Sequence, residues 1–453
     1  MCGIAGNNFS DSRLASRMLE NLKHRGPDGQ GMASDGDVVH GHTRLALVDL
    51  SSASSQPFKS KDSMLTFNGE VWNYRELRES LGGQWRTSGD TEVLLRVLDL
   101  YGLDGLSKVD GMFAFCWTKG TEAWLVRDRY GKIPLYVAKS RKGFIWSSER
   151  KAFDRGVTPI AVPPGFALNL NTGKWIKWYS LPSYANAKLS PEEILEYLTK
   201  GVTKRIDADA PVCCLISGGL DSSIILGLAK SIHPDVQAYV AYQDDKSPDL
   251  AAARKLCRQW EVNLTEVKVS LSKKDFTHAA ECIEIPSKAQ VEIAAMCIPL
   301  ARRISSDGFK ACLSGEAADE LFGGYGNFCI QASKETEEGV VILRKALLTK
   351  MSRGNFIRCN KAFMAHGVEC RLPFMERFLV EGAINMGKTA SPVGKKLLKR
   401  AVEGIVPSFI ISRQKETFQG AAGSSREAAS IFTNPIKSYN NTIREFFGYL
   451  TKD

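Results

Sequence analysis

The sequence has no long hydrophobic run, no CxxC pair and only 6 histidines. None of its apolar stretches approaches the ~20 residues that a membrane-spanning helix needs. The start, MCGIAGNNFS, has neither the basic segment nor the apolar core of a secretory signal. Its 11 cysteines are scattered, which argues against a disulfide framework and a structural zinc site. These absences favour a protein of a reducing compartment, the cytoplasm, with no membrane partner.

The composition is that of a globular protein of two or three domains. The chain has 453 residues, of which 43% are hydrophobic and 24% are charged. Its formal net charge of +10 suits anionic small molecules and would also suit a nucleic acid. However, the basic cluster Gly394–Arg400 is interleaved with leucine and is typical of a solvated amphipathic helix face. We therefore do not expect a nucleic-acid partner.

The first ~180 residues predict two sheets covered by helices. Helical spacing of apolar residues occurs over Ser12–Lys23 and Thr91–Tyr101. Between and after these stretches, strand-like segments occur at Val38–Leu50, Met64–Phe67, Phe113–Trp117, Ala123–Val126, Leu135–Ala138 and Phe144–Ser147. The polar segment Leu181–Ser190 lacks periodicity and predicts a linker. We expect one domain over residues 1–182 and another over residues 190–453.

The second domain alternates strands with helices, which predicts a parallel, doubly wound sheet. Ser190-Pro191-Glu192-Glu193 predicts a capped helix start. The expected strands are Pro211–Ile216, Val236–Tyr242, Leu264–Val269 and Ala311–Leu313, and a helix is expected over Asp249–Glu261. The rest of the chain, from about residue 340 to 447, is mostly helical in pattern, and the tail is either a docked helix over Ile443–Leu450 or frayed.

The second residue is a candidate nucleophile. Removal of Met1, which is common before a small side chain, would leave Cys2 with a free α-amine next to its own sulfur. An α-amine titrates near ~8 and can act as the general base for the thiol. The adjacent Gly3 would allow close approach of a substrate to the backbone. The alternative interpretation from position alone is a buried small residue.

Further polar motifs in the first domain fit the binding of a free amino acid. The Asn68 amide and the Gly69 N–H are donors suited to an oxyanion hole. Arg44 could bind a carboxylate, and Asp90 could bind an ammonium group. The alternatives are a surface ion pair for Arg44 and a helix cap for Asp90.

A glycine-rich loop in the second domain fits the binding of a pyrophosphate. Leu215–Ser223 follows a strand and opens a helix, so backbone N–H groups and a helix N-terminus converge there. The loop lacks the Gly-x-x-x-x-Gly-Lys pattern of a Walker A motif. Asp221 in such a loop suits Mg²⁺ that carries pyrophosphate.

The first-domain motifs resemble the class II glutamine amidotransferase domain of the N-terminal nucleophile hydrolases, which has an αββα sandwich. These motifs, in chain order, are Cys-Gly-Ile-Ala-Gly, His-Arg-Gly-Pro-Asp, Asn-Gly-Glu and Ser-Gly-Asp-Thr-Glu. The resemblance implies that Cys2 attacks the glutamine amide, that Asn68 and Gly69 stabilise the oxyanion, and that ammonia leaves. It implies a glutamine site made of Arg44, Leu45, Leu47, Val48, Asn68, Gly69, Glu70, Gly89 and Asp90.

The second-domain motifs resemble the synthetase domain of glutamine-hydrolysing asparagine synthetases, a family of PP-loop ATP pyrophosphatases. They are Ser217–Ser223, Ser247–Leu250, Leu313–Tyr325, Gly367–Glu376 and Arg413–Glu416. The resemblance implies ATP and Mg²⁺ as cofactors. It places ATP at Leu215, Ser217, Gly218, Gly219, Asp221, Ser222, Val240, Ser314 and Gly315, and Mg²⁺ at Asp221 and Asp319. It makes Glu316 the base for ammonia attack and Lys415 the cation at the α-phosphate.

One segment departs from the family pattern. Where asparagine synthetases have a Thr-Thr-Ile-Arg type segment for aspartate, this chain has Ala289, Gln290, Val291 and Glu292. An acid in place of the Arg reverses the preference for a carboxylate. Either Lys288 or Gln290 compensates and aspartate is the acceptor, or the acceptor is another carboxylate, such as a uronic-acid sugar.

The sequence therefore predicts a carbon–nitrogen ligase that transfers ammonia from glutamine to an adenylated carboxylate, with AMP and pyrophosphate as products. The alternatives are an intramolecular amide-forming cyclase of the β-lactam synthetase or lasso-peptide cyclase type, and a non-enzymatic protein on the same scaffold. Retention of Cys2, Asn68, Gly69 and Asp90 favours the first function. A homodimer is expected from the resemblance.

Overall fold

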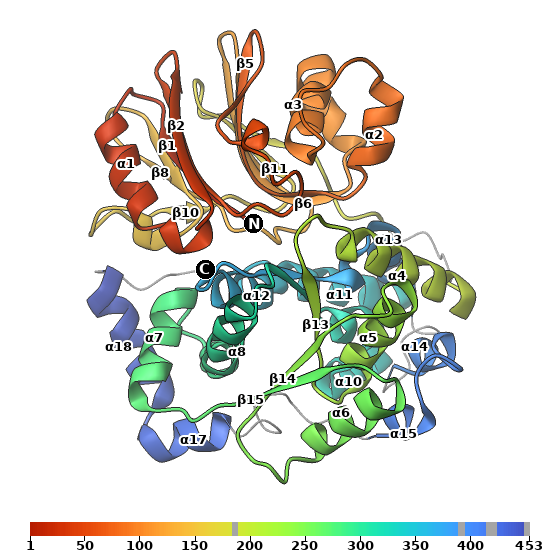
Figure 1. Cartoon of the computed structure of the whole chain (residues 1–453). Helices are drawn as coiled ribbons and strands as arrows, with labels where there is room; N and C mark the ends of the chain where they lie inside the picture. Colours follow the sequence, from red (N-terminus) through yellow and green to blue (C-terminus); the bar gives the residue numbers. More distant parts are fainter. Residues whose placement is uncertain (184–188, 388–394, 414–423, 448–453) are drawn as a thin grey trace.

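The computed structural model describes residues 1–183, 189–387, 395–413 and 424–447. Figure 1 shows two stacked parts, with the N-terminal part in red to yellow above and the C-terminal part in green to blue below. Residues 184–188 of the predicted linker lie outside the described residues. The boundaries 1–182 and 190–453 therefore stay a prediction.

The N-terminal part contains two antiparallel sheets of six strands each. The order in the first sheet is β10 (Ile160–Ala161), β8 (Tyr136–Lys139), β9 (Phe144–Ser147), β1 (Gly3–Asn7), β3 (Val38–Arg44) and β2 (Gly29–Asp35). The order in the second is β12 (Trp175–Lys177), β11 (Phe166–Asn169), β7 (Glu122–Arg127), β6 (Gly111–Lys119), β5 (Ser63–Val71) and β4 (Phe58–Lys59).

Three apolar layers hold this part together. Helix α1 (Ser12–Glu20) packs its buried face on one side of the first sheet. Apolar side chains of both sheets, such as Ile4 and Met112, meet between them. Helix α3 (Asp90–Tyr101) covers the far side of the second sheet, and α2 (Tyr74–Leu81) packs beside it. The predicted αββα sandwich is thus confirmed.

The C-terminal part is built on a five-stranded parallel sheet. Its order is β15 (Leu264–Lys268), β14 (Ala238–Tyr242), β13 (Val212–Leu215), β16 (Ala311–Leu313) and β17 (Glu369–Arg371). Helices α5 (Leu220–Ile232), α6 (Pro248–Gln259) and α8 (Lys288–Ser306) pack against it. The predicted doubly wound sheet is therefore confirmed.

Further helices surround this sheet (Figure 1). They are α4 (Pro191–Ile206), α7 (Lys273–Ile283), α9 (Ala318–Phe322), α10 (Gly326–Lys334), α11 (Glu337–Met351), α12 (Asn355–Met364), α13 (Arg377–Asn385), α14 (Lys396–Ala401), α15 (Ser408–Ile411), α17 (Ser424–Ile431) and α18 (Pro435–Phe447). Helix α4 begins as predicted, since Ser190 Oγ accepts the Glu193 N–H and the Glu193 carboxylate accepts the Ser190 N–H.

Several elements differ from those expected from the sequence. The strand expected over Val38–Leu50 ends at Arg44, and the chain then turns through Asp49, whose φ is 51°. Strand β2 was not predicted, because it is largely exposed and lacks apolar alternation. The last helix spans Pro435–Phe447 instead of Ile443–Leu450, and residues 448–450 lie outside the described residues.

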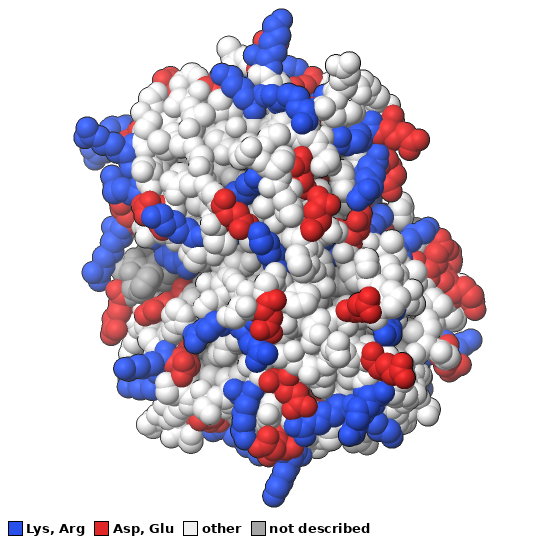
Figure 2. Space-filling view, viewed as in Figure 1, with Lys and Arg blue, Asp and Glu red and all other residues white. Residues whose placement is uncertain are grey.

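The surface mixes charges of both signs. Figure 2 shows Lys and Arg side chains interspersed with Asp and Glu on the viewed face, instead of a single basic patch. In the described part of the chain, no helix has the length and apolarity needed to span a membrane. The buried polar groups near the junction of the two parts are therefore the candidates for substrate binding and catalysis.

Candidate active sites

The Cys2 thiol lies at the start of β1, next to the chain that leaves β3. Cys2 is 8% exposed, and the Leu45 N–H donates to its Sγ at 3.4 Å. Arg25 Nε donates to the Cys2 carbonyl oxygen at 2.9 Å. Burial raises the pKa of the Cys2 thiol, and the nearby N-terminal ammonium only partly opposes this. A nucleophilic Cys2 therefore needs a base within reach.

Asn68 and Gly69, predicted to act with Cys2, do lie beside it. Asn68 Oδ1 accepts the Cys2 N–H at 2.9 Å, and Asn68 Nδ2 donates to Ser148 Oγ at 3.2 Å. Gly69 has φ +149°, and an added Cβ there would lie 2.0 Å from the Met112 carbonyl oxygen. This position therefore requires glycine. The oxyanion role of both residues stays a prediction.

The predicted carboxylate-binding loop follows β3 and meets the turn before α3. Arg44 donates to the carbonyl oxygens of Asp49 at 2.6 Å and Ser51 at 2.8 Å, so it holds this loop closed. The Cβ of a side chain at Gly89 would lie 3.3 Å from Asp49 Cβ. The loop and the turn therefore form one rim. The remaining predicted loop residues are Leu45 and Leu47, which are buried, and Val48, which is half-buried.

Two buried acids, Glu70 and Asp90, face a cation from the other part of the chain. Asp90 Oδ2 accepts the Val71 N–H at 2.9 Å, and Arg371 of β17 lies 3.4 Å from Glu70 Oε1. Burial is the largest cause that raises the pKa of Asp90 to about 6, and it raises the pKa of Glu70 well above its usual range. The predicted ammonium site thus includes an arginine that sequence reasoning had given no role.

This pKa predicts an acid limb in glutamine hydrolysis. Asp90 must be ionised to attract the substrate ammonium, and its pKa of about 6 in the free protein means that this charge is lost below pH 6. Because the α-amine of Cys2 must also be unprotonated, we expect kcat/KM for glutamine to fall about tenfold more per pH unit below pH 6 than above it. Initial rates of glutamate release between pH 5 and 8 measure this. Asp90→Asn should lower kcat/KM throughout and remove that limb. An unchanged acid limb in this variant would contradict the assignment.

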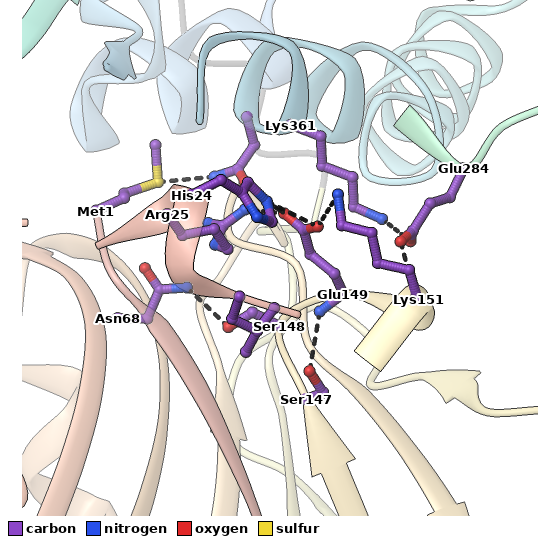
Figure 3. Close-up of polar contacts among 12 residues, drawn as sticks. Met1, His24, Arg25, Asn68, Ser147, Ser148, Glu149, Lys151, Glu284 and Lys361 are labelled. Carbon is purple, nitrogen blue, oxygen red and sulfur yellow. Dashed lines mark hydrogen bonds and ion pairs between the residues drawn. The ribbon is translucent and has the colours of Figure 1, made fainter. Parts of the chain in front are cut away.

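Buried ion pairs lead from Cys2 toward the C-terminal part (Figure 3). Arg25 NH1 pairs with Glu149 Oε1 at 2.6 Å. His24 Nε2 lies 3.2 Å and Lys151 Nζ lies 2.7 Å from Glu149 Oε2. Burial alone would raise the pKa of Glu149, but Lys151, His24 and Arg25 hold it well below its usual range. Glu149 is therefore ionised, and its ion pair with Arg25 holds the Arg25 side chain next to the Cys2 backbone.

Glu284, at the C-terminal end of α7, joins the two parts of the protein. Its carboxylate accepts the N–H groups of Arg150 at 2.9 Å and Lys151 at 3.0 Å, in η4 (Arg150–Ala152) of the N-terminal part. The same carboxylate pairs with Lys361 Nζ on α12. The side chains of Glu284 and Lys361 are both 0% exposed. Because its contacts lie on both parts, Glu284 fixes how they dock.

Loss of this charge should destabilise the protein. We expect Glu284→Gln to lower the free energy of unfolding by about 3 kcal/mol, because it leaves Lys361 buried with a weaker partner. Urea unfolding followed by circular dichroism measures this. The matched control is Glu196→Gln, whose partner Lys200 is 52% exposed and whose loss should cost at most about 0.5 kcal/mol. Equal effects of the two variants would show that the Glu284 pair does not stabilise the interface.

The predicted pyrophosphate loop connects β13 to α5. Gly218 has φ +76°, and an added Cβ would lie 2.1 Å from the Asp249 carbonyl oxygen, so this turn requires glycine. The Ser217 N–H donates to Ser222 Oγ at 3.1 Å, and Gly219 caps α5 without a side-chain hydrogen bond. The helix N-terminus is therefore available to an anion.

The other predicted nucleotide residues lie around this loop. An added Cβ at Gly315 would meet the Ser222 backbone nitrogen at 2.7 Å, so the two predicted phosphate segments touch. The Ser314 N–H donates to the Arg371 carbonyl oxygen at 3.0 Å. Leu215 ends β13, and Val240 lies on the adjacent strand β14. These positions fit the predicted nucleotide site, whose occupancy stays a prediction.

The two predicted magnesium ligands converge on one cation. Lys395 Nζ lies 2.5 Å from Asp221 Oδ1 and 2.6 Å from Asp319 Oδ1. Its residue is 5% exposed, so the prediction of a solvated face was wrong at Lys395. Two acids at the loop attract the ammonium inward. In the sequence, Lys395 is a lysine near leucines, which is also the pattern of a solvated amphipathic helix.

Asp221 and Asp319 fit a magnesium ion that arrives with phosphates. The described residues contain no group of three or more His, Cys, Asp or Glu side chains placed to hold a metal on their own. Mg²⁺, however, commonly takes one or two carboxylates and completes its shell with phosphate oxygens and water. Because both carboxylates already share the Lys395 ammonium, they can share a divalent cation bound to pyrophosphate.

Glu316, the predicted base, is held by helix α12. Asn355 Nδ2 donates to Glu316 Oε1 at 2.8 Å, and Arg358 pairs with Glu316 Oε2. A second acid, Glu320, accepts hydrogen bonds from Asn355 at 3.2 Å and from Tyr325 at 2.7 Å. Burial and the nearby Glu316 raise the pKa of Glu320 to about 7. The predicted base is thus positioned by α12 and adjacent to Glu320, whose pKa is about 7.

The segment that departs from the family pattern lies at the start of α8, beside this site. Gln290 Nε2 donates to Asn355 Oδ1 at 2.9 Å, which links the segment to Glu316. Glu292 is buried and pairs with Lys288 at 2.9 Å, while Ser425 Oγ donates to it at 2.6 Å. The acid is therefore neutralised within the protein. Lys415, the predicted α-phosphate cation, lies outside the described residues.

The main residues that sequence reasoning missed are contacts across the junction or around the loop. Arg25 and Arg371 belong to motifs that carry the family resemblance, but neither was given a role. Glu149, Glu284 and Lys361 had no local signal, and Lys395 had only that of a solvated helix face. Arg413, in another quoted motif, donates to the Gly218 carbonyl oxygen and pairs with Asp249, both at 2.6 Å. Their positions follow from packing, which a local pattern does not encode.

A sandwich with a thiol at its second residue, docked on a parallel sheet with a pyrophosphate-type loop, defines the class of two-domain glutamine amidotransferases. The glutamine amidotransferase domain family matches residues 1–172, and the asparagine synthase family matches residues 193–345 and 334–448. The chain belongs to the glutamine-hydrolysing asparagine synthetase family.

Individual relatives agree with this assignment. Asparagine synthetase [glutamine-hydrolyzing] 1 of Arabidopsis thaliana is 30% identical over 464 residues, which cover 93% of this chain and 78% of that protein. Asparagine synthetase [glutamine-hydrolyzing] of Asparagus officinalis is 31% identical over 465 residues with the same coverage. Among solved structures, glutamine phosphoribosylpyrophosphate amidotransferase from B. subtilis matches 60% of this chain and 69% of that chain, with a TM-score of 0.36 and 19% identity.

Proposed function

We propose that the chain is an ATP-dependent, glutamine-hydrolysing amidotransferase that converts an adenylated carboxylate to an amide. One observation carries the proposal. Helix α12 contacts both candidate sites, through Asn360 at the Met1–Cys2 end and through Asn355 and Arg358 at Glu316. The proposed source of ammonia would then lie at the middle of one buried helix, and the proposed base for its attack at the N-terminal end of the same helix. Membership of the family supports the same function.

In the first step, Cys2 is the nucleophile once Met1 has been removed. Its thiol gives a proton to its own α-amine, which the Asn68 carbonyl oxygen orients. The thiolate attacks the glutamine amide carbon, ammonia leaves, and water hydrolyses the thioester to glutamate. Asn68 and Gly69 stabilise the oxyanion, which requires the Asn68 amide to turn from Ser148 toward the substrate. Glu70 and Asp90 bind the substrate ammonium.

In the second step, the loop from Ser217 to Ser222 and the N-terminus of α5 bind the phosphates of ATP. Asp221 and Asp319 would hold Mg²⁺, which would neutralise the pyrophosphate leaving group. Lys395 pairs with both acids and would also neutralise the leaving group, together with Lys415, the cation predicted at the α-phosphate. Glu316 accepts the proton that ammonia loses when it attacks the acyl-adenylate.

We propose aspartate as the acceptor acid. The Arabidopsis and Asparagus relatives are asparagine synthetases, which supports this substrate. The ion pair of Glu292 also supports aspartate, because an acid that is paired with Lys288 and accepts a hydrogen bond from Ser425 does not repel a second carboxylate. A cyclase is not favoured, because the Cys2 and Asn68 arrangement is intact and the relatives are named glutamine-hydrolyzing.

The test is release of AMP and pyrophosphate across a panel of acids with glutamine present. We expect turnover with aspartate and at most about a hundredth of it with glutamate or a uronic-acid sugar. Turnover with a uronic-acid sugar alone would replace aspartate as the acceptor. No turnover with any acid, combined with intact glutamine hydrolysis, would contradict the ligase function.

Two further points concern the compartment and the oligomeric state of the enzyme. We place it in the cytoplasm, because its cysteines, including Cys2, are all free, as a reducing compartment keeps them. The predicted homodimer remains a prediction for sedimentation analysis.

A further inference from the structure

A cavity of about 480 Å³ lies on the N-terminal part, and none of its lining residues belongs to the two candidate active sites. It is bounded by strand β4, the turn after this strand and helix α3. Ligand pockets commonly measure about 300–1,000 Å³, so a small molecule fits this space. Four basic side chains line it, those of Lys59, Lys61, Arg86 and Arg96, against one acid, Glu92. The cavity therefore favours an anion.

The two arginines of the cavity are held in place by the surrounding chain. The Arg86 Cζ lies 4.5 Å from the centroid of the Phe58 ring, and its Nη2 donates to a carbonyl oxygen of β4 at 2.7 Å. The Arg96 Cζ lies 3.8 Å from the centroid of the Trp85 ring, and its Nη2 donates to Glu92 Oε1 at 2.8 Å. Guanidinium groups fixed in this way present planar pairs of N–H donors, which match the oxygens of a phosphate.

The positive charge of the cavity exceeds what nearby acids offset. Lys59 and Lys61 are exposed, and neither side chain forms an ion pair or a hydrogen bond within the described residues. The Arg86 side chain likewise has no acid partner in this part of the chain. Asp62 follows Lys61 in the chain but does not line the cavity. A phosphate monoester, with about −1.5 to −2 charges at pH 7, matches several cations better than a single carboxylate does.

The acid of the lining, Glu92, is used by the protein itself. It is 3% exposed, and its Oε2 accepts the N–H groups of Arg86 at 3.0 Å and Thr87 at 2.9 Å. Burial alone would raise the pKa of Glu92, but these hydrogen bonds and the one from Arg96 lower it. Glu92 is therefore ionised, and its charge is compensated by groups that already contact it.

The turn that Glu92 holds is part of the rim beside the candidate glutamine site. It spans residues 86–89, and the Ser88 N–H donates to Asp49 Oδ2 at 2.8 Å on the opposite side of the rim. Asp90, the predicted ammonium ligand, follows directly as the first residue of α3. Because Arg96 pairs with Glu92, an anion that draws the Arg96 guanidinium into the cavity removes one support of this turn.

We propose that this cavity binds a small organic phosphate through its two arginines and two lysines, and that the bound phosphate loosens the turn at the rim of the glutamine site. The effect on glutamine rests on the proposed function, whereas the binding site does not. Phe58 and Leu95 are buried apolar residues of the lining. They suit a ligand that carries an apolar group beside its phosphate.

The binding test is calorimetric titration of the full chain with phenyl phosphate, which joins a phosphate to an apolar ring. We expect Arg86→Gln and the double variant Lys59→Gln/Lys61→Gln each to raise the Kd at least about fivefold, because each removes positive charge from the cavity. Arg141→Gln, which removes an exposed arginine between β8 and β9, is the matched control and should stay within about 1.5-fold. Benzoate should bind at least about tenfold more weakly than phenyl phosphate. No binding, or equal affinity in the cavity variants and the control, would overturn the site.

Tungstate, a heavy tetrahedral dianion, tests where the phosphate binds. Crystals of the full chain are soaked with tungstate, and anomalous scattering is measured. We expect a peak in the cavity between the Arg86 and Arg96 guanidinium groups that is lost in Arg86→Gln and retained in Arg141→Gln. The absence of this peak from the unsubstituted protein, or its persistence in Arg86→Gln, would overturn the assignment.

Glutamate release without ATP tests the effect on the glutamine site. Saturating phenyl phosphate should raise KM for glutamine at least about twofold and leave kcat within about 1.5-fold, because the turn lies at the substrate rim and not at Cys2. The rise should be lost in Arg86→Gln and kept in Arg141→Gln. An unchanged or lower KM would overturn the coupling. If the unsubstituted protein releases no glutamate at all, the proposed function has failed, while the titration still decides whether the phosphate site exists.

Discussion

Replacing Cys2 by alanine is expected to abolish glutamine-dependent amide formation and to preserve amide formation from added ammonium. Loss of a covalent nucleophile should lower glutamate release at least about a thousandfold. The synthetase residues are untouched, so the rate with saturating ammonium should stay within about threefold. Because alanine is also small, Met1 trimming should continue. Glutamate and pyrophosphate release, measured in parallel with each nitrogen donor, test this.

The matched control for this variant is Cys116→Ala. Cys116 is a second buried thiol of the same part, in the core between the two sheets, and has no role in the proposed chemistry. We expect glutamine hydrolysis in this control within about twofold of the unsubstituted protein. Retention of glutamine hydrolysis by Cys2→Ala would contradict the assignment of the nucleophile. Loss of both nitrogen sources together would indicate structural damage.

The second large effect is expected from Asp221→Asn. This substitution keeps the shape of the side chain and removes one of the two acids that converge on the Lys395 ammonium. Charge stabilisation at a phosphoryl site is worth several kcal/mol, so pyrophosphate release should fall at least about a hundredfold. Glutamine hydrolysis without ATP should be unchanged, because Asp221 lies in the synthetase loop. Pyrophosphate and glutamate assays on one preparation measure both.

A control for this variant is available in the same part of the protein. Asp245 pairs with Lys268 at the surface, and both side chains are more than half exposed. Asp245→Asn should leave pyrophosphate release within about twofold. If Asp221→Asn retains pyrophosphate release at the level of this control, then Asp221 does not act at the nucleotide, and the proposed magnesium site fails with it.

Much of the first site could be predicted from the sequence because its chemistry is local. Cys2 lies just before β1, and Asn68 and Gly69 lie within β5 near its end, so all three belong to short continuous motifs. Gly69 adds a backbone requirement, φ +149°, that other residues rarely meet. Asp90 is the first residue of helix α3, so the direction of the chain already places it next to the turn that meets the loop after β3.

The second site was predictable in part for a similar reason. The loop around Gly218 must turn with positive φ between a parallel strand and a helix, and the glycine pattern shows this turn directly. Lys395 was not predictable in this way. It follows a segment outside the described residues, and it is drawn inward only by carboxylates that are distant in sequence. The same holds for Glu369, whose partner is the first residue of the chain.

The coupling of the two sites lies in packing. Helix α12 is amphipathic in sequence, yet in the fold nearly all of it is buried, since both faces find partners. Lys361 illustrates the difficulty, because a lysine in a helix is usually solvated. Here it pairs with Glu284, which is held by backbone N–H groups of the N-terminal part. Sequence periodicity does not reveal a buried charge whose partner lies on a distant helix and is itself held by the other part of the chain.

The central claim is that one protein releases ammonia at Cys2 and uses it at Glu316. The most direct measurement supplies [amide-¹⁵N]glutamine, ATP and aspartate in a medium with unlabelled ammonium at a concentration too low to support amide formation by itself, and analyses the product amide by mass spectrometry. The account predicts that the product carries predominantly ¹⁵N, because ammonia passes internally along α12. A product that carries the unlabelled nitrogen of the medium, despite active glutamine hydrolysis, would contradict it.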